Sequence, residues 1–233
     1  GPDFPILSEP PTKTSLPPAS KMVDSDTEPP PVVDSKPVES EIGRMLSSDE
    51  WEWTEPQRLS INSEANEYEP WVAPDELTLL FCSDRGGGTG GFDLYVSRRT
   101  SKYEPWNPPQ ALTELNSDSH DEAPHMSADG LRLWFSSNRN EDERDLWFAD
   151  RTSTTANWSA PQLFSDEVNL RFDADIEPTV SDDGCTLVFC STREPKHGIF
   201  DLWMSTRPST EAEWGSPVHL NRSINSDDWQ GSP

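Results

Sequence analysis

The chain has 233 residues, a formal net charge of −25 and a hydrophobic content of only 32%. The acidic balance argues against nucleic acid and anionic membrane surfaces as partners, because phosphate binding needs clustered Lys and Arg. No apolar run reaches the length of a membrane span, and three cysteines cannot form a disulfide framework. No initiator Met or signal-peptide pattern stands at the start, so we expect an excerpt or a processed chain.

Residues 1–48 form a proline-rich segment for which we predict disorder. Ten prolines are mixed with Ser, Thr, Asp and Glu, and no aromatic residue occurs between Phe4 and Trp51. Such a segment cannot bury enough apolar surface to offset the entropy of ordering it. Its composition is typical of an extended tether. A ligand for a proline-recognising domain is the alternative.

From Trp51 onward the sequence repeats with a period of about 54 residues, which indicates a repeat architecture. Each unit contains a W-x-x-P element, then an Asn, an acidic stretch that ends in proline, a central Phe and an Asp-Leu-aromatic triplet. The central phenylalanines are Phe81, Phe135 and Phe189. Cys82 and Cys190 follow two of them, so we expect these cysteines to be small apolar strand residues.

Four segments in each unit have strand chemistry. The first ends at Asp-Gly, a signal for a two-residue hairpin turn. In the second, Leu131, Leu133 and Phe135 point to one face and Arg132 and Trp134 to the other. The third begins at the Asp-Leu-aromatic triplet and the fourth at W-x-x-P. Because aromatic residues fall on both faces, both must be covered, as in a β-propeller.

We therefore predict an all-β fold: a β-propeller of four-stranded antiparallel blades in residues 49–233, after the disordered proline-rich segment. Three full blades are expected at about 62–112, 116–164 and 169–220, with the start of a fourth at 221–233. A lone last strand is predicted at Trp53–Leu59. Since propellers typically close with about four to eight blades, we expect the chain to be incomplete at its C-terminus.

The string P-x-x-S-x-D-G-x-x-L-x-F-x-S-x-R, followed by Asp-Leu-aromatic, resembles the WD-like propeller repeat of TolB-type proteins. The GGGTGGFDLYVSRR and W-x-x-P elements are similar to copies found beside OmpA-type peptidoglycan-binding domains. The resemblance covers roughly residues 51–233. It implies a bacterial envelope or signalling protein, with a periplasmic or otherwise extracytoplasmic location; a cytoplasmic location is the alternative. One departure is Glu76, which stands where the other units have Gly130 and Gly184, and predicts a different turn type.

An arginine follows the second strand of each unit and an aspartate opens the third. Adjacent antiparallel strands would bring the two together. We predict a structural ion pair in every blade, because a ligand site rarely needs the same residue in all units. The predicted pairs are Arg85–Asp93, Arg139–Asp145 and Arg193–Asp201.

An acidic loop precedes the first strand of each unit. In a propeller this loop ends at a mouth of the central channel, where carboxylates would attract a cation or a basic peptide. The candidate ligand-binding residues are Glu67, Glu69, Asp121, Glu122, Asp175, Glu177 and Asp228. Solvated surface charge is the competing interpretation. Calcium is a weaker candidate ligand, because no loop has EF-hand spacing.

Two further motifs point to no cofactor and no metal. GGGTGG (residues 86–91) lacks the Lys-Ser/Thr of a phosphate-binding loop and joins two strands. His120 and His125 have no third zinc ligand nearby in the sequence.

We therefore predict a non-catalytic module that binds a protein or a peptide. A basic peptide is one candidate for this partner. No nucleophile elbow, Asp-box or distinct catalytic carboxylate pair is found, so no enzymatic activity is predicted. Two alternatives stay open. One is a glycan-binding propeller that uses Trp71, Trp134 and Trp229, and the other is an accessory domain of a larger enzyme.

Overall fold

The computed structural model describes residues 55–140 and 143–233. The chain divides into two units, Gly1–Glu55 and Pro56–Pro233. The segment predicted to be disordered, residues 1–48, lies outside the described residues, and so does Trp53. Of the lone last strand predicted at Trp53–Leu59, residues 55–59 are described, and they form no strand.

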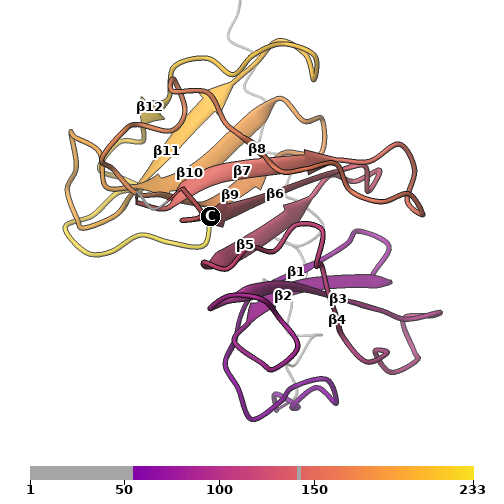
Figure 1. The fold of residues 1–233 in the computed structure, drawn as a ribbon. Helices are drawn as coiled ribbons and strands as arrows, with labels where there is room; N and C mark the ends of the chain where they lie inside the picture. Colours follow the sequence, from indigo (N-terminus) through magenta and orange to yellow (C-terminus); the bar gives the residue numbers. More distant parts are fainter. Residues whose placement is uncertain (1–54, 141–142) are drawn as a thin grey trace, which may run out of the picture. The chain divides into compact units, whose positions relative to one another are not determined.

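Three four-stranded antiparallel sheets make up the described unit, each in simple sequential order (Figure 1). The first strands are β1 (Glu67–Val72), β5 (Asp121–Met126) and β9 (Asp175–Val180). The second strands are β2 (Thr78–Ser83), β6 (Arg132–Ser137) and β10 (Thr186–Ser191). The third strands are β3 (Asp93–Arg98), β7 (Asp145–Asp150) and β11 (Asp201–Thr206). The outer strands are β4 (Gln110–Ala111), β8 (Gln162–Leu163) and β12 (Val218–His219).

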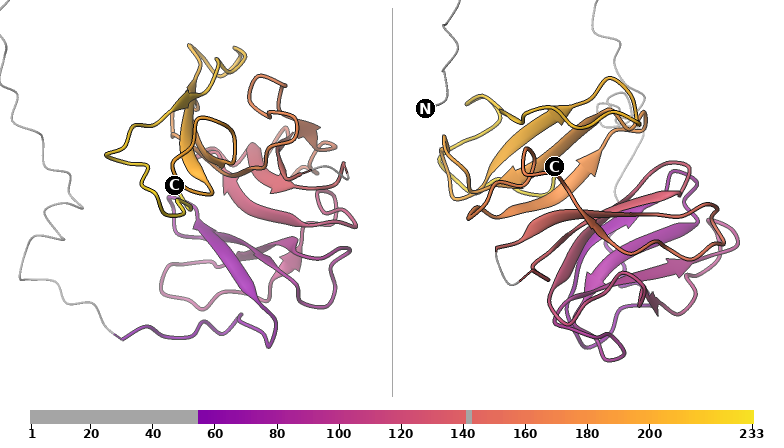
Figure 2. Two further views of the ribbon diagram at one scale, coloured as in Figure 1. Left: turned by 90° about the vertical axis from the view of Figure 1, so that its left-hand side faces the viewer. Right: turned by 45° about the horizontal axis from the view of Figure 1, so that its top comes forward.

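The predicted all-β propeller architecture is confirmed for these three blades. The sheets follow one another in chain order (Figure 2), and the first strands of successive sheets lie next to each other. The blades share one register, because the central phenylalanine always faces the aromatic residue of the Asp-Leu-aromatic triplet. The pairs are Phe81–Tyr95, Phe135–Trp147 and Phe189–Trp203.

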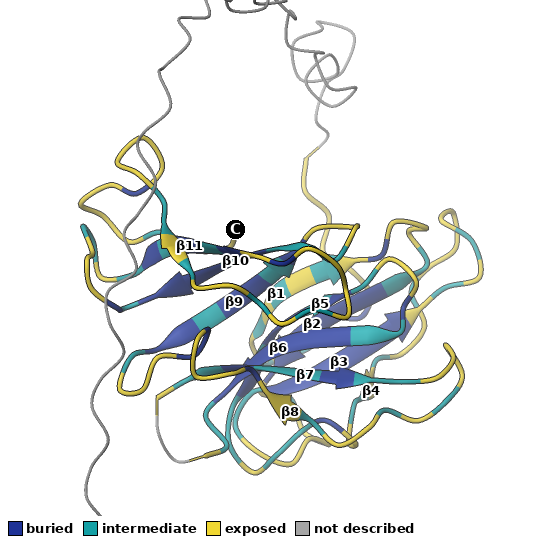
Figure 3. Ribbon diagram, turned by 90° about the horizontal axis from the view of Figure 1, so that it is seen from above, coloured by how far each residue is buried: buried dark blue, intermediate teal, exposed yellow. Residues whose placement is uncertain are grey.

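The alternation predicted for the second strand of blade 2 places a hydrophobic core on each of its faces. Leu133 and Phe135 are fully buried against blade 1, next to Leu80. Trp134 faces blade 3, where it packs with Phe189. Each large apolar side chain removed from water contributes about 1.5–3 kcal/mol, so the blades stabilise one another. Figure 3 shows that the second strands are mostly buried, whereas β8 and most of the loops are exposed.

The prediction that these arginines pair with the aspartates of the third strand is wrong, because their partners are acidic residues of the first strand. Arg85 instead forms an ion pair with Glu67 at 2.7 Å, and Arg193 pairs with Asp175 at 2.6 Å; Arg139 pairs with Asp121 in the same way. Each guanidinium lies over its blade's central phenylalanine, 4.9–5.1 Å from the ring centre. Lying across this ring, it reaches back to the acidic residue of the first strand rather than to Asp93, Asp145 or Asp201.

A second set of arginines, at the end of the third strand, was not singled out from the sequence. Each lies 4.2 Å from the ring centre of the W-x-x-P tryptophan, in the pairs Arg99–Trp106, Arg151–Trp158 and Arg207–Trp214. The Nε atoms donate to the carbonyl oxygens of Glu76, Gly130 and Gly184 at 2.7–2.8 Å. The tryptophan is therefore tied to the turn between the first two strands.

That turn is longer than the two-residue turn predicted. Ser127 N donates to Arg132 O at 2.9 Å, so residues 128–131 form the loop, and Gly130 N donates back to Ser127 O at 2.8 Å. Glu76 adopts the same left-handed conformation as Gly130, with φ values of 61° and 70°. The different turn type predicted for Glu76 is therefore wrong, because the loop imposes the conformation on a residue that carries a Cβ.

We expect Glu76→Gly to stabilise the protein by about 0.5–1 kcal/mol, because it relieves a left-handed conformation that costs a non-glycine residue about 1 kcal/mol or more. The matched change Gly130→Ala should destabilise by about 1–2 kcal/mol, since its Cβ would also come within 3.3 Å of Arg151 Nη2. Urea unfolding of both variants measures the difference. Equal effects of the two changes would contradict the shared turn geometry.

Candidate functional site

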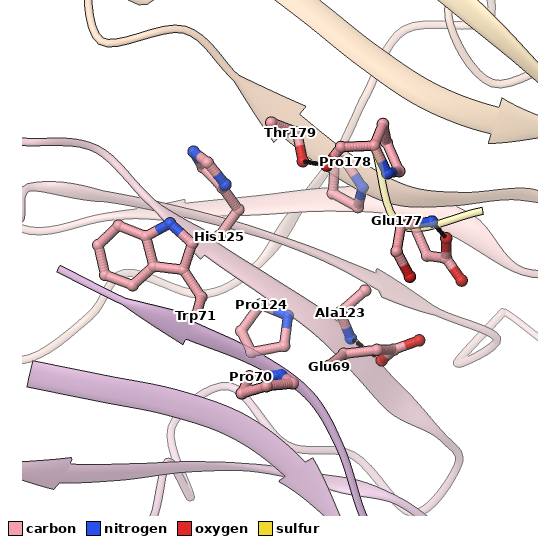
Figure 4. Close-up of a pocket in the computed structure, with 11 residues that line it drawn as sticks. Glu69, Pro70, Trp71, Ala123, Pro124, His125, Glu177, Pro178 and Thr179 are labelled. Atoms are coloured by element: carbon pink, nitrogen blue, oxygen red, sulfur yellow. Dashed lines mark hydrogen bonds between the residues drawn. The ribbon is translucent and has the colours of Figure 1, made fainter. Parts of the chain in front are cut away.

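A pocket of about 220 Å³ lies where the first strands of the three blades meet (Figure 4). Each first strand contributes three consecutive residues with proline in the middle. The lining residues are Glu69, Pro70, Trp71, Ala123, Pro124, His125, Glu177, Pro178 and Thr179, with Ser232 and Pro233 from the C-terminal segment. We call this pocket the mouth pocket.

The residue before each of these prolines has an unusual backbone conformation. Glu69, Ala123 and Glu177 have φ values of 52°, 52° and 57°, and the strand register shifts at each point. A proline disfavours the right-handed helical conformation in the residue before it, and a bulge re-aims the groups that it contains. The N–H groups of these residues therefore leave the ladder of their own sheet.

The preceding blade supplies the acceptor for the N–H groups of Ala123 and Glu177. Ala123 N donates to Glu69 Oε2 at 2.6 Å, and Glu177 N donates to Ser136 Oγ at 2.9 Å. Ser232 N, which also precedes a proline, donates to Glu177 Oε2. We call the N–H groups of Ala123, Glu177 and Ser232 the mouth amides. Each one links a blade, or the C-terminal segment, to the blade before it.

Two buried thiols support the carboxylates of these links. Cys82 Sγ lies 3.2 Å from Glu69 Oε2, and Cys190 Sγ lies 3.3 Å from Glu177 Oε2. Burial strongly raises the pKa of both thiols, and the neighbouring glutamates raise it further. The cysteines are therefore neutral S–H donors as well as the small strand residues that the sequence predicts.

The mouth pocket combines apolar rings with carboxylate oxygens. In Figure 4 the carboxylates of Glu69 and Glu177 lie toward one end, and the rings of Trp71 and His125 toward the other. Burial lowers the pKa of His125, whose Nε2 lies 3.0 Å from Val180 O, so this ring is neutral at pH 7. The Oε1 atoms of both glutamates have no hydrogen-bond partner among the described residues. They are available to a ligand.

Burial raises the pKa of Glu69, and the charges of Glu122 and Glu177 also raise it. Glu122 lines an adjoining space of about 310 Å³ together with Tyr68 and Trp229. This second space shares Glu69 and Glu177 with the mouth pocket. The carboxylates of Glu69, Glu122 and Glu177, one from each first strand, therefore lie around these two connected spaces.

The structure divides the predicted acidic residues into two groups. Glu69, Glu122 and Glu177 come together around the mouth pocket and the adjoining space. Glu67, Asp121 and Asp175 are held in the ion pairs with arginine described above. Glu122 also has an arginine partner, because Arg144 Nε lies 2.6 Å from its Oε2. Asp228 is exposed and lines neither space.

The tryptophans named for glycan binding also divide. Trp71 lines the mouth pocket, and Trp229 is 55% exposed beside the adjoining space. Trp134 is 3% exposed and buried between blades. Sequence reasoning missed His125 and the three prolines as lining residues. Their signal is the proline that recurs at one position of every repeat, which was used only to count the repeats.

Among the residues that the structure describes, no group of three His, Cys, Asp or Glu residues is placed to hold a metal ion. The same residues include no helix long and apolar enough to cross a membrane.

Several solved structures resemble this fold at low identity. TolB from Acinetobacter baumannii has a TM-score of 0.42 and 14% identity over 65% of this chain and 33% of its own. A putative TolB from Agrobacterium tumefaciens has a TM-score of 0.42 and 18% identity, over 68% of this chain and 51% of its own. A GH62 hydrolase in complex with xylotriose has a TM-score of 0.50 and 12% identity, over 79% of this chain and 60% of its own. The chain thus spans less than two thirds of each protein. No protein-family model and no curated protein matches it.

These comparisons correct the prediction that the chain has no enzymatic activity. The solved structures that share its fold include a glycoside hydrolase, the GH62 hydrolase in complex with xylotriose. The missing nucleophile elbow and Asp-box therefore do not exclude an enzyme, because glycoside hydrolysis depends on a pair of carboxylates. The propeller fold itself is shared with enzymes.

We expect Glu69→Gln to stabilise the protein increasingly as pH rises. The folded pKa of Glu69 is raised, so the wild type loses stability as pH rises from the ordinary glutamate pKa through the raised value. Glutamine does not titrate and keeps an acceptor for Ala123 N. Thermal melting between pH 4 and 8 should therefore show a growing advantage of the variant, and an advantage independent of pH would contradict the account.

Glu67→Gln is the matched control with the opposite sign. Burial alone would raise the pKa of Glu67, but hydrogen bonds from Ser63 and the charge of Arg85 lower it. The wild-type carboxylate therefore adds stability that is lost as pH falls through the lowered pKa. Relative to wild type, this variant should become less stable as pH rises from the lowered pKa of Glu67 to the ordinary glutamate pKa.

Proposed function

We propose that the mouth pocket binds a short neutral glycan. The observation that carries this proposal is the lining itself, in which the Trp71 ring and three proline rings stand beside two carboxylates with free oxygens. A sugar ring has C–H faces that pack on apolar rings and hydroxyl groups that donate to carboxylates. Ligand pockets commonly combine such an apolar lining with a few placed polar groups.

The adjoining space gives a ligand room to extend. It shares Glu69, Pro70, Glu177 and Ser232 with the mouth pocket, and it adds Trp229 as a second exposed ring. Rings at two points along a path are suited to a chain of sugar units. This supports an oligosaccharide in preference to a single monosaccharide.

A basic peptide is the second candidate, supported by the carboxylates of the lining. Glu69 and Glu177 line the mouth pocket, and none of its described lining residues is Lys or Arg, so the pocket carries a negative potential that favours positive charge. The protein or peptide partner expected from the sequence stays a prediction, as does the periplasmic or other extracytoplasmic location.

Isothermal titration calorimetry of the full chain with xylotriose and with tetralysine tests the proposal. We expect xylotriose to bind, and Trp71→Ala to weaken that binding at least tenfold, because the ring face is lost. Tyr103→Ala is the matched control, since Tyr103 is 86% exposed and does not line the mouth pocket. Assay of reducing ends in the same samples detects hydrolysis.

Trp71 also packs against the core between blades 1 and 2, so the melting temperature of the variant must be measured. Glu177→Gln provides a second variant, which keeps the size and an acceptor oxygen but loses the charge. A folded Trp71→Ala protein that binds xylotriose like wild type would refute the proposal. Binding of tetralysine alone, lost in Glu177→Gln, would favour the basic peptide.

A further inference from the structure

Blade 2 departs from the other blades at two positions that are coupled in space. The residue before the proline of the first strand is Glu69 in blade 1 and Glu177 in blade 3, but Ala123 in blade 2. The residue after the central phenylalanine is Cys82 or Cys190 in the same two blades, but Ser136 in blade 2. Both glutamates contact the cysteine of their own blade.

The two changes together preserve the link to the next blade. In blades 1 and 3 the glutamate carboxylate accepts the next mouth amide. An alanine methyl group cannot do so, and a buried N–H left unpaired costs about 1–3 kcal/mol. Ser136 Oγ takes over this role, because it accepts Glu177 N directly at 2.9 Å.

The exchange changes the ligand surface while it keeps the fold. The acceptor in blade 2 is Ser136, which is 1% exposed within β6. In blades 1 and 3 the acceptor is instead a glutamate that lines the mouth pocket. Ala123 lies between Glu69 and Glu177 in Figure 4 and lines the mouth pocket. A glutamate at this position would bring a third carboxylate to that wall.

We infer that Ala123, supported by Ser136, is a specificity-determining residue that favours a neutral ligand over a cation at the mouth pocket. This rests on the proposed function and names the charge class of its ligand. Without a carboxylate at position 123, the wall of the mouth pocket focuses a weaker negative potential than it would with one. The methyl group of Ala123, next to Pro124 in the chain, leaves an apolar surface that the C–H face of a sugar ring can cover.

The double variant Ala123→Glu/Ser136→Cys tests this by giving blade 2 the pattern of blades 1 and 3. In the full chain we expect at least tenfold weaker binding of xylotriose and at least tenfold tighter binding of tetralysine than in wild type. Ala123→Gln/Ser136→Cys adds the same bulk without charge. It should weaken xylotriose binding and leave the affinity for tetralysine unchanged.

Thr152→Glu is the matched control for charge, because it adds one carboxylate on an exposed loop of the same blade. It should change neither affinity by more than about twofold. Melting temperatures identify any variant that fails to fold, and in that case Ala123→Gln in the Ser136 background supplies the test of pocket size.

The outcomes separate this inference from the proposed function. If wild type does not bind xylotriose but the glutamate variant gains tetralysine affinity, the glycan proposal fails and the role of Ala123 in charge selection stands. If wild type binds xylotriose and the folded glutamate variant keeps both affinities, the inference is overturned and the glycan proposal stands. Equal gains from Thr152→Glu would likewise overturn the inference.

Discussion

One backbone N–H group per blade junction, on the residue before a proline, is the constraint on which the mouth pocket depends. The proline and the left-handed conformation before it turn this group away from its own sheet. In Ala123 and Glu177, which are buried, an acceptor must be provided. Glu69, Ser136 and Glu177 provide it. The side chains that join the blades thus also determine what the pocket presents to a ligand.

The remaining carboxylates are arranged by a second constraint, the charge of a buried arginine. Arg193 is 4% exposed and lies over Phe189, where an uncompensated charge would be costly. Asp175 compensates it, and the equivalent acids do so in the other blades. Acidic residues only two positions apart therefore have different roles. Asp175 neutralises an arginine inside the blade, and Glu177 lines the mouth pocket.

The strands and their order follow from the sequence because a repeat reinforces every local signal. The alternation of Leu133, Trp134 and Phe135 predicts a sheet with two covered faces, and both are covered. The partner of Arg139 could not be predicted, because Asp121 and Asp145 both lie near the end of β6 and only the packing over Phe135 decides between them. The role of Ser136 depends on a contact across blades that local sequence does not reveal.

A titration of the full chain with xylotriose, followed by amide and indole chemical shifts in NMR, shows directly whether a glycan binds in the mouth pocket. We expect shifts at the Trp71 indole and at the amides of Ala123 and Glu177, with the Trp106 indole unaffected because Arg99 covers it. Saturating shifts confined to residues outside the mouth pocket, or none at all, would contradict the glycan proposal.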